Sequence, residues 1–164
     1  MEANKDGLDL SEISKDEDGN YTVLNVFYAG DAEQGWSQGL WPHKANYGTQ
    51  VYQISDLSSQ LTLGTICHEN GHALLGYPDL YHYNTTRKEG TSGLLMVGDY
   101  CLMGVGCYNG NIKNPAPPNA YLRYFQTKIK GNIVDLNSIN DGTMLSIKAN
   151  DYGTGTVYKW TNPD

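Results

Sequence analysis

The sequence predicts a protein of the α+β class, and three observations support that prediction. A run rich in β-branched and aromatic residues lies at 21–30, apolar positions recur at helical spacing over 58–76, and short strand-like runs follow residue 131. The chain of 164 residues has the length of one compact domain. We therefore expect a sheet with a helix packed on it, followed by a β-rich tail.

The first expected element is a buried strand over YTVLNVFYAG, residues 21–30, which follows a polar turn and ends at a glycine. A loop is expected from 31 to 48, because GWSQGLWPH within it has neither a strand nor a helix period. We expect this loop to line a cleft or to cover the core.

A helix is expected next, within 58–76. Ser58 or Ser59 can cap its N-terminus, since a serine oxygen accepts a hydrogen bond from the free N–H groups of the first turn. Gly76 and then Pro78 end the helix, because glycine adopts the left-handed conformation of a C-cap and proline cannot continue a helix.

The second half of the chain is expected to be less regular. Residues 77–118 hold many Gly, Tyr and Asn and indicate ordered irregular chain with a tight turn at 101–106. A short helix is expected at 119–128, with these apolar residues on one face: Tyr121, Leu122 and Phe125. From 132 onward, three β-like runs separated by NDG and DYGTG turns predict a meander or the start of a β-sandwich.

Charge and hydropathy exclude several classes of function. Eleven basic and eighteen acidic residues give a net charge of −7, which leaves no basic surface for nucleic acid or an anionic membrane. The longest apolar runs span about six residues, well short of the ~20 that a transmembrane helix needs. The N-terminal residues lack the pattern of a secretory signal.

The chemistry of the chain is indicated by CHENGH, residues 67–72, which places an HExxH motif on the expected helix. Side chains four residues apart lie on the same helix face, so His68 and His72 can bind one zinc ion. Glu69 is rotated by about 100° around the helix and can reach a zinc-bound water without binding the metal. The motif therefore predicts zinc-dependent hydrolysis with Glu69 as the general base, and it does not by itself name the bond that is cleaved.

Six segments give the chain a resemblance to a known family. In chain order they are VFYAG (26–30), WPH (41–43), CHENGH (67–72), GYPDLY (76–81), GDYCLM (98–103) and an Asn-Pro…Tyr…Arg pattern between 114 and 123. Over residues 6–130 the chain resembles the immune inhibitor A-like secreted zinc metallopeptidases.

The resemblance implies a zincin fold, in which the active-site helix packs on a sheet and an irregular lower part carries a Met-turn. It implies a zincin-like domain over 1–130 that is incomplete at its N-terminus, with 131–164 as the start of a following β-rich domain. By the same resemblance the protein is secreted and is a zinc endopeptidase that cleaves extracellular proteins. The fragment itself is expected to be inactive if the missing part completes the site.

The resemblance also assigns roles to individual residues. His68 and His72 match the zinc-binding histidines, Glu69 the general base, Met103 the Met-turn beneath the metal, and Asp79 the third ligand.

The third ligand is left open by the spacing. Asp79 follows His72 by seven residues, one more than the usual family spacing. His82 and Asp99 are therefore alternative third ligands.

The three cysteines allow two states. Cys67 precedes the first zinc histidine and Cys101 precedes the expected Met-turn, so a Cys67–Cys101 disulfide would tie the helix to the floor of the site. Three free thiols, with Cys107 as the third, are the alternative, because cysteine is often simply a core residue.

Other features carry weaker indications. Asp16, Asp18 and Asn20 alternate as in calcium loops, but the glycine and glutamate positions of an EF-hand are absent, so a solvated acidic turn is favoured over a Ca²⁺ site. Tyr100 and Tyr108 are candidates to hydrogen-bond an oxyanion. The rival to an enzyme is a catalytically inactive zincin-like module that binds an extracellular protein or glycan through Tyr and Trp side chains.

Overall fold

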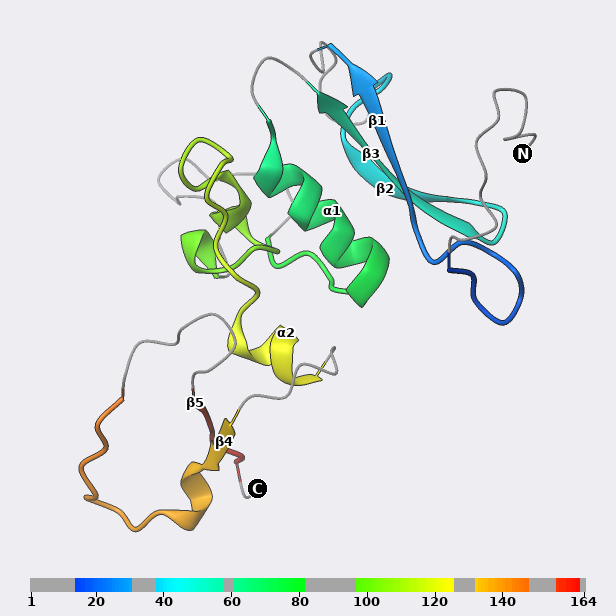
Figure 1. The fold of residues 1–164 in the computed structure, drawn as a ribbon. Helices are drawn as coiled ribbons and strands as arrows, with labels where there is room; N and C mark the ends of the chain where they lie inside the picture. Colours follow the sequence, from blue (N-terminus) through cyan, green and yellow to red (C-terminus); the bar gives the residue numbers. More distant parts are fainter. Residues whose placement is uncertain are drawn as a thin grey trace, which may run out of the picture.

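The computed structural model describes residues 14–30, 38–57, 61–81, 97–125, 132–147 and 156–162. They form a small mixed α/β structure, with η denoting a 3-10 helix, whose elements are β1 (Leu24–Ala29), β2 (His43–Tyr47), β3 (Gln50–Leu57), α1 (Leu63–Leu75), η1 (Gly98–Tyr100), η2 (Val105–Tyr108), α2 (Ala120–Phe125), β4 (Asn132–Asp135), η3 (Leu136–Ser138) and β5 (Thr156–Lys159). Figure 1 shows α1 between the sheet of β1 to β3 and the segment that carries η1 and η2. No helix among these residues is long and apolar enough to cross a membrane.

Strand β1 confirms the strand expected at 21–30, but the expectation that it is buried is wrong. Val26 and Phe27 keep 43% and 45% of their surface exposed. The sheet has the order β1-β3-β2, with β1 parallel to β3 and β2 antiparallel to it. Because α1 packs mainly on β3 and β2, the edge strand β1 is left partly uncovered.

The loop expected from 31 to 48 is confirmed over 38–42 but is wrong over 43–47, which form β2. Strands β2 and β3 form a hairpin in which Tyr47 pairs with Gln50. The two residues between them, Gly48 and Thr49, make the turn, and Gly48 has the positive φ of 59° that such a turn demands. Residues 31–37 lie outside the described part of the chain.

Strand β3 was not among the expected elements, and part of its buried face is polar. Gln53 and Ser55 are fully buried. The Ser55 hydroxyl donates to Gln53 Oε1 at 2.7 Å, and Gln53 Nε2 donates to Asn25 Oδ1 at 2.8 Å. A buried polar group is stable only when it is hydrogen-bonded, so this chain of bonds replaces the apolar alternation expected of a buried strand.

Helix α1 confirms the expected helix but begins later than its expected serine caps. Its N-cap is Thr62, whose side chain makes no capping bond, and Ser58 and Ser59 lie outside the described residues. Instead, the N–H of Gly64 donates to the carbonyl of Ile112 at 2.7 Å. The carbonyl of a distant segment therefore accepts the hydrogen bond of a first-turn N–H, a bond that the N-cap side chain accepts in many helices.

The C-terminus of α1 ends as expected at Gly76, which is left-handed with φ of 63°. The Gly76 N–H donates to His72 O at 3.2 Å, and the Tyr77 N–H donates to Gly71 O at 3.1 Å. The bond from Gly76 to His72 is that of an αL C-cap, and the bond from Tyr77 to Gly71 turns the chain sharply back along the helix.

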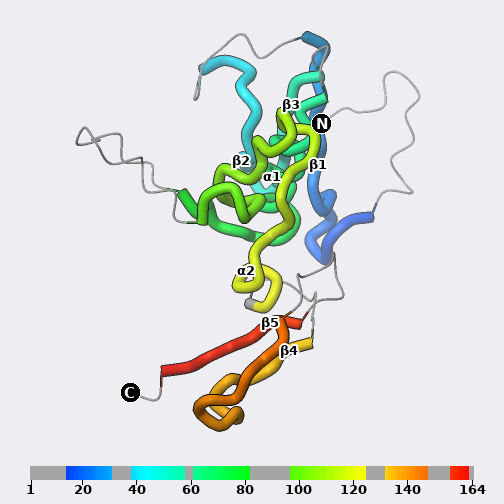
Figure 2. Tube along the Cα trace, turned by 90° about the vertical axis from the view of Figure 1, so that its left-hand side faces the viewer, coloured from blue at the N-terminus to red at the C-terminus, as the bar shows by residue number. Residues whose placement is uncertain are grey.

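The irregular character expected of 77–118 is confirmed for residues 77–81 and 97–118, with short 3-10 turns and a tight turn after Cys101. The buried apolar side chains gather mainly in this segment: Tyr77, Cys101, Leu102, Met103, Cys107 and Leu122. Figure 2 shows the segment running along α1 before it enters α2.

The expected helix at 119–128 is confirmed over α2, and residues 126–128 lie outside the described part. Leu122 is fully buried, as its expected apolar face requires. Tyr121 is 57% exposed, so its placement on that face is wrong. An α-helix turns 100° per residue, and only one of these two neighbouring residues points at the core.

The first and last of the three strands expected after residue 131 are confirmed as β4 and β5, but the pairing of a meander is wrong among the described residues. Strands β4 and β5 pair in parallel, and residues 143–147 form no strand. A meander joins neighbouring strands antiparallel through tight turns, whereas a parallel pair needs a longer connection, here the chain from 136 to 155. In Figure 1 this two-stranded sheet lies apart from β1 to β3.

The three cysteines are free thiols, so of the two states that the sequence allows, the Cys67–Cys101 disulfide is not the one formed. The sulfur of Cys101 accepts a hydrogen bond from the Asn119 N–H at 3.4 Å, beside the start of α2. Cys107 donates to Gly104 O at 3.5 Å. The two buried cysteines are thus held by their own segment, which agrees with the alternative of three free thiols.

Candidate metal centre

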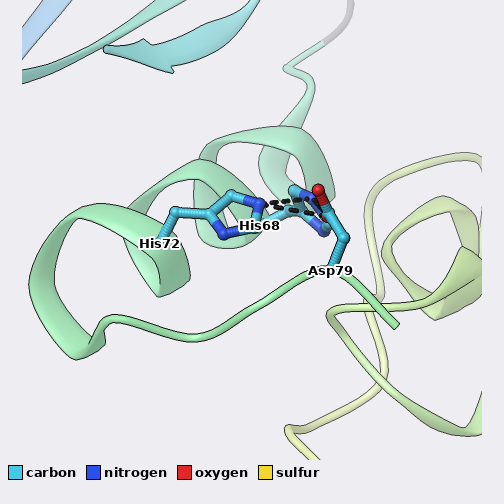
Figure 3. Close-up of side chains that lie close together, drawn as sticks. All are labelled: His68, His72 and Asp79. Carbon is cyan, nitrogen blue, oxygen red and sulfur yellow. Dashed lines mark hydrogen bonds and ion pairs between the residues drawn. The ribbon is translucent and has the colours of Figure 1, made fainter. Parts of the chain in front are cut away.

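Three side chains from the predicted site meet at one point. His68 and His72 project from neighbouring turns of α1, and Asp79 projects from the segment that follows the helix (Figure 3). The left-handed turn at Gly76 sends this segment back toward the histidines, and the Leu80 N–H donates to Met103 O at 2.7 Å. These backbone contacts accommodate the additional residue between His72 and Asp79.

The three facing atoms form a nearly equilateral triangle. Asp79 Oδ1 lies 3.0 Å from His68 Nε2 and 3.1 Å from His72 Nε2, and the two Nε2 atoms are 3.1 Å apart. Ligands that hold zinc tetrahedrally at ~2.0–2.1 Å stand about 3.3 Å from each other. The triangle therefore needs to open by only a few tenths of an ångström to hold such an ion.

Backbone carbonyls orient both rings. His68 Nδ1 lies 2.9 Å from Leu102 O, and His72 Nδ1 lies 2.5 Å from Tyr77 O. A carbonyl only accepts, so each Nδ1 carries the proton and a neutral ring presents an Nε2 lone pair to the centre. Two lone pairs and a carboxylate oxygen at this spacing repel one another unless a proton or a metal ion lies between them.

In the absence of a metal, a proton takes that place. Burial lowers the pKa of His68, but hydrogen bonds to Asp79, to Cys107 and to the Leu102 carbonyl outweigh it and raise the pKa to about 10. Burial alone would raise the pKa of Asp79, yet the two histidines hold it well below its usual range. The metal-free cluster is accordingly a His68 cation against an Asp79 carboxylate, and metal uptake at neutral pH must release a proton.

We expect the metal-free protein to lose stability as the pH rises from 7 to 10. The pKa of His68 lies above its ordinary value of 6.5, so its protonation stabilises the fold fully below pH 6.5 and no longer does so once the pH passes about 10. Thermal unfolding of metal-free protein across this range measures the loss. In Asp79→Asn, the slope over the same range should be much smaller, and equal slopes in the two proteins would contradict the prediction.

Glu69 lies beside the cluster on the same helix and also faces strand β2. Burial raises the pKa of Glu69, while His68, His72 and the backbone N–H of Lys44 act to lower it. A carboxyl group with a raised pKa is better suited to accept and return a proton near neutral pH. The arrangement agrees with the role expected of Glu69.

Met103 lies directly against the helix between the two histidines. It is fully buried, and its sulfur stands 2.7 Å from the position that a Cβ on Gly71 would take. Glycine at 71 therefore allows the Met103 segment to approach α1 closely, and the neighbouring Leu102 carbonyl can reach His68. Met103 thus packs against α1 beside the two histidines, and its role as a Met-turn residue stays a prediction.

The other residues predicted for the site are not brought to it. Asp99 has an exposed side chain on η1, and His82 lies outside the described residues. Asp16 Oδ1 accepts the N–H groups of Asp18 and Asn20 at 3.1 and 2.8 Å, as in a solvated acidic turn. Among the described residues, the group with a geometry that could hold a metal is His68, His72 and Asp79.

The two tyrosines considered for an oxyanion differ. Tyr100 is 88% exposed. Tyr108 is 62% exposed, and its pKa is raised by partial burial and by the charges of Cys107, Glu69 and Asp79. Tyr108 is therefore the one of the two within electrostatic reach of the cluster.

Two contacts of the site were missed by sequence reasoning. Tyr81 hydrogen-bonds Asp79, and the Lys44 N–H bonds Glu69. Tyr81 belongs to the GYPDLY segment, so its position two residues after a candidate ligand was an available signal. The Lys44 contact uses only backbone and leaves no signal in the sequence.

The chain was compared with protein families, curated proteins and solved structures. No protein-family model, no curated protein and no solved structure matches the chain. The class that the fold and the site define is thus a small mixed α/β protein with a His–His–Asp cluster on and just after one helix.

Proposed function

We propose that this chain is the catalytic part of a secreted zinc-dependent endopeptidase of the zincin class, which hydrolyses peptide bonds of extracellular proteins. The observation that carries the proposal is the convergence of His68 Nε2, His72 Nε2 and Asp79 Oδ1 within 3.1 Å of one another, with Glu69 next to them. Two imidazoles and one carboxylate are a ligand set found at catalytic zinc sites.

In this proposal, different residues bind the metal, transfer the proton and orient the ligands. His68, His72 and Asp79 would hold zinc, which supplies a Lewis acid for the scissile carbonyl and lowers the pKa of water. Glu69 accepts the proton of the attacking water on its carboxylate and returns it to the leaving amine. The carbonyls of Leu102 and Tyr77 keep both imidazoles in the tautomer that presents Nε2 to the metal.

The proposal is tested by zinc content and proteolysis measured on the same preparations. We expect about one zinc per chain after dialysis against metal-free buffer, loss of that zinc in His72→Ala, and zinc-dependent cleavage of an unfolded protein substrate. His43→Ala is the matched control, because His43 stacks on Trp41 at 4.4 Å and belongs to the sheet rather than to the cluster.

The outcomes separate the candidate functions. A folded protein without zinc would favour the inactive module that binds an extracellular partner. Zinc bound without proteolysis, in a chain extended at its N-terminus as well as in this one, would favour a zinc hydrolase that acts on another bond. Equal zinc content in the wild type and in His72→Ala would reject the site.

A further inference from the structure

Tyr81 lies outside the triad and contacts two of its members. Its ring stacks on the His68 ring, with centroids 6.1 Å apart and an interplanar angle of 26°. Its hydroxyl forms a hydrogen bond with Asp79. Tyr81 itself is half-buried, and it is not in the group of atoms that could hold the metal.

The contact with Asp79 restricts the rotation of its carboxylate. The same oxygen, Oδ1, faces both His68 and His72. A carboxylate on a flexible side chain can rotate and present either oxygen or both, and each choice alters the ligand geometry. A hydroxyl that donates to the carboxylate restricts this rotation, and the bond is strong because the acceptor is charged.

The contact with His68 restricts the ring. His68 Nδ1 donates to Leu102 O. The His72 ring lies edge-on to the His68 ring, with centroids 4.8 Å apart and an interplanar angle of 85°. The Tyr81 ring lies nearly parallel to His68. Rotation of the imidazole about its Cβ–Cγ bond would have to displace the tyrosine, so the ring is held in the orientation that points Nε2 at the centre.

We propose that Tyr81 is a positioning residue of the metal centre, which fixes the Asp79 carboxylate through its hydroxyl and the His68 imidazole through its ring. This inference rests on the proposed zinc function. Tyr81 acts on the affinity and geometry of the site and takes no part in the chemistry.

The test is a double-mutant cycle on zinc affinity, measured by competition with a chromophoric chelator. Tyr81→Phe removes only the hydroxyl and should weaken zinc binding about tenfold, the lower end of the range for partners that orient metal ligands. Tyr81→Leu also removes the ring contact and should weaken it further. Tyr100→Phe, at a tyrosine that is 88% exposed, is the matched control and should have no effect.

Coupling to Asp79 distinguishes positioning from general stability. In an Asp79→Asn background, Tyr81→Phe should change zinc affinity by less than about twofold, because the charged acceptor is gone. Cobalt in place of zinc should show a changed visible spectrum in Tyr81→Phe and an unchanged one in Tyr100→Phe.

Three outcomes are distinguishable. Weaker zinc binding in Tyr81→Phe that disappears in the Asp79→Asn background supports the inference. Zinc binding by the wild type with equal affinity in Tyr81→Phe and Tyr100→Phe overturns the role of Tyr81 and leaves the proposed function standing. No zinc binding by the wild type overturns both.

Discussion

Replacing Glu69 with glutamine should abolish peptide hydrolysis while leaving zinc bound. Glutamine keeps the size of the side chain but cannot accept the proton of the attacking water, and a positioned general base is worth about 10²–10⁴-fold in rate. Because Glu69 is outside the group of potential ligand atoms, the zinc content should remain that of the wild type. Turnover of a fluorogenic peptide and elemental analysis of the same sample measure the two quantities.

The control for this substitution is Glu17→Gln, at an exposed position in the acidic turn. It makes the same chemical change away from the cluster and should leave both quantities unchanged. Loss of zinc in Glu69→Gln would show that Glu69 is a ligand. Retained turnover would show that another group accepts the proton.

Replacing Gly64 with alanine should destabilise the fold by about 3 kcal/mol, although alanine is the better helix former. A Cβ at position 64 would stand 1.8 Å from the carbonyl oxygen of Cys107 and 2.8 Å from its carbon. These are backbone atoms and cannot rotate away, so η2 would have to separate from α1. Chemical denaturation of wild type and variant measures the difference in the free energy of unfolding.

Gly71→Ala provides the comparison. Its nearest obstacle is the Met103 sulfur at 2.7 Å, which belongs to a flexible side chain and can shift. Gly71→Ala should therefore cost less than Gly64→Ala, and Met103→Ala in the same chain should remove part of the clash. An increase in stability for Gly64→Ala would show that η2 does not pack on the helix at this distance.

The left-handed turn at 110–112 belongs to the same contact. Gly110, Asn111 and Ile112 all have positive φ, of 58°, 54° and 66°. A β-branched residue rarely adopts this conformation, and it costs roughly 1–2 kcal/mol. In return, the Ile112 carbonyl accepts the Gly64 N–H and the Ile112 N–H donates to Tyr108 O. Docking of η2 on the start of α1 thus maintains a conformation that the local sequence disfavours.

Some elements could be predicted because their causes are local. The pairing of His68 with His72 depends only on the 3.6-residue turn of a helix, and the end of α1 at Gly76 only on the freedom of glycine at positive φ. Strand β1 and helix α2 were found from the same short-range patterns. The burial of their side chains could not be predicted in this way, because it depends on which distant residues cover them.

Strand β3 shows why the remainder of the fold could not be predicted. Gln53 and Ser55 contradict the apolar pattern of a buried strand, and their burial is possible only because Asn25, on another strand, completes the hydrogen bonds. Asn25 and Gln53 are 28 residues apart, so no short stretch of the sequence contains both hydrogen-bond partners. The parallel pairing of β4 with β5 is decided in the same way, by residues more than twenty positions apart.

By itself, the sequence determined the local part of the candidate site, namely an HExxH motif on a helix that a glycine ends. Only the tertiary structure decided that Asp79, rather than the exposed Asp99, joins the histidines and that the cysteines stay unpaired. The physical reason is the range of the interactions. The motif is set by helix geometry over four residues, whereas Asp79 is placed by a backbone hydrogen bond between Leu80 and Met103, which the sequence pattern does not encode.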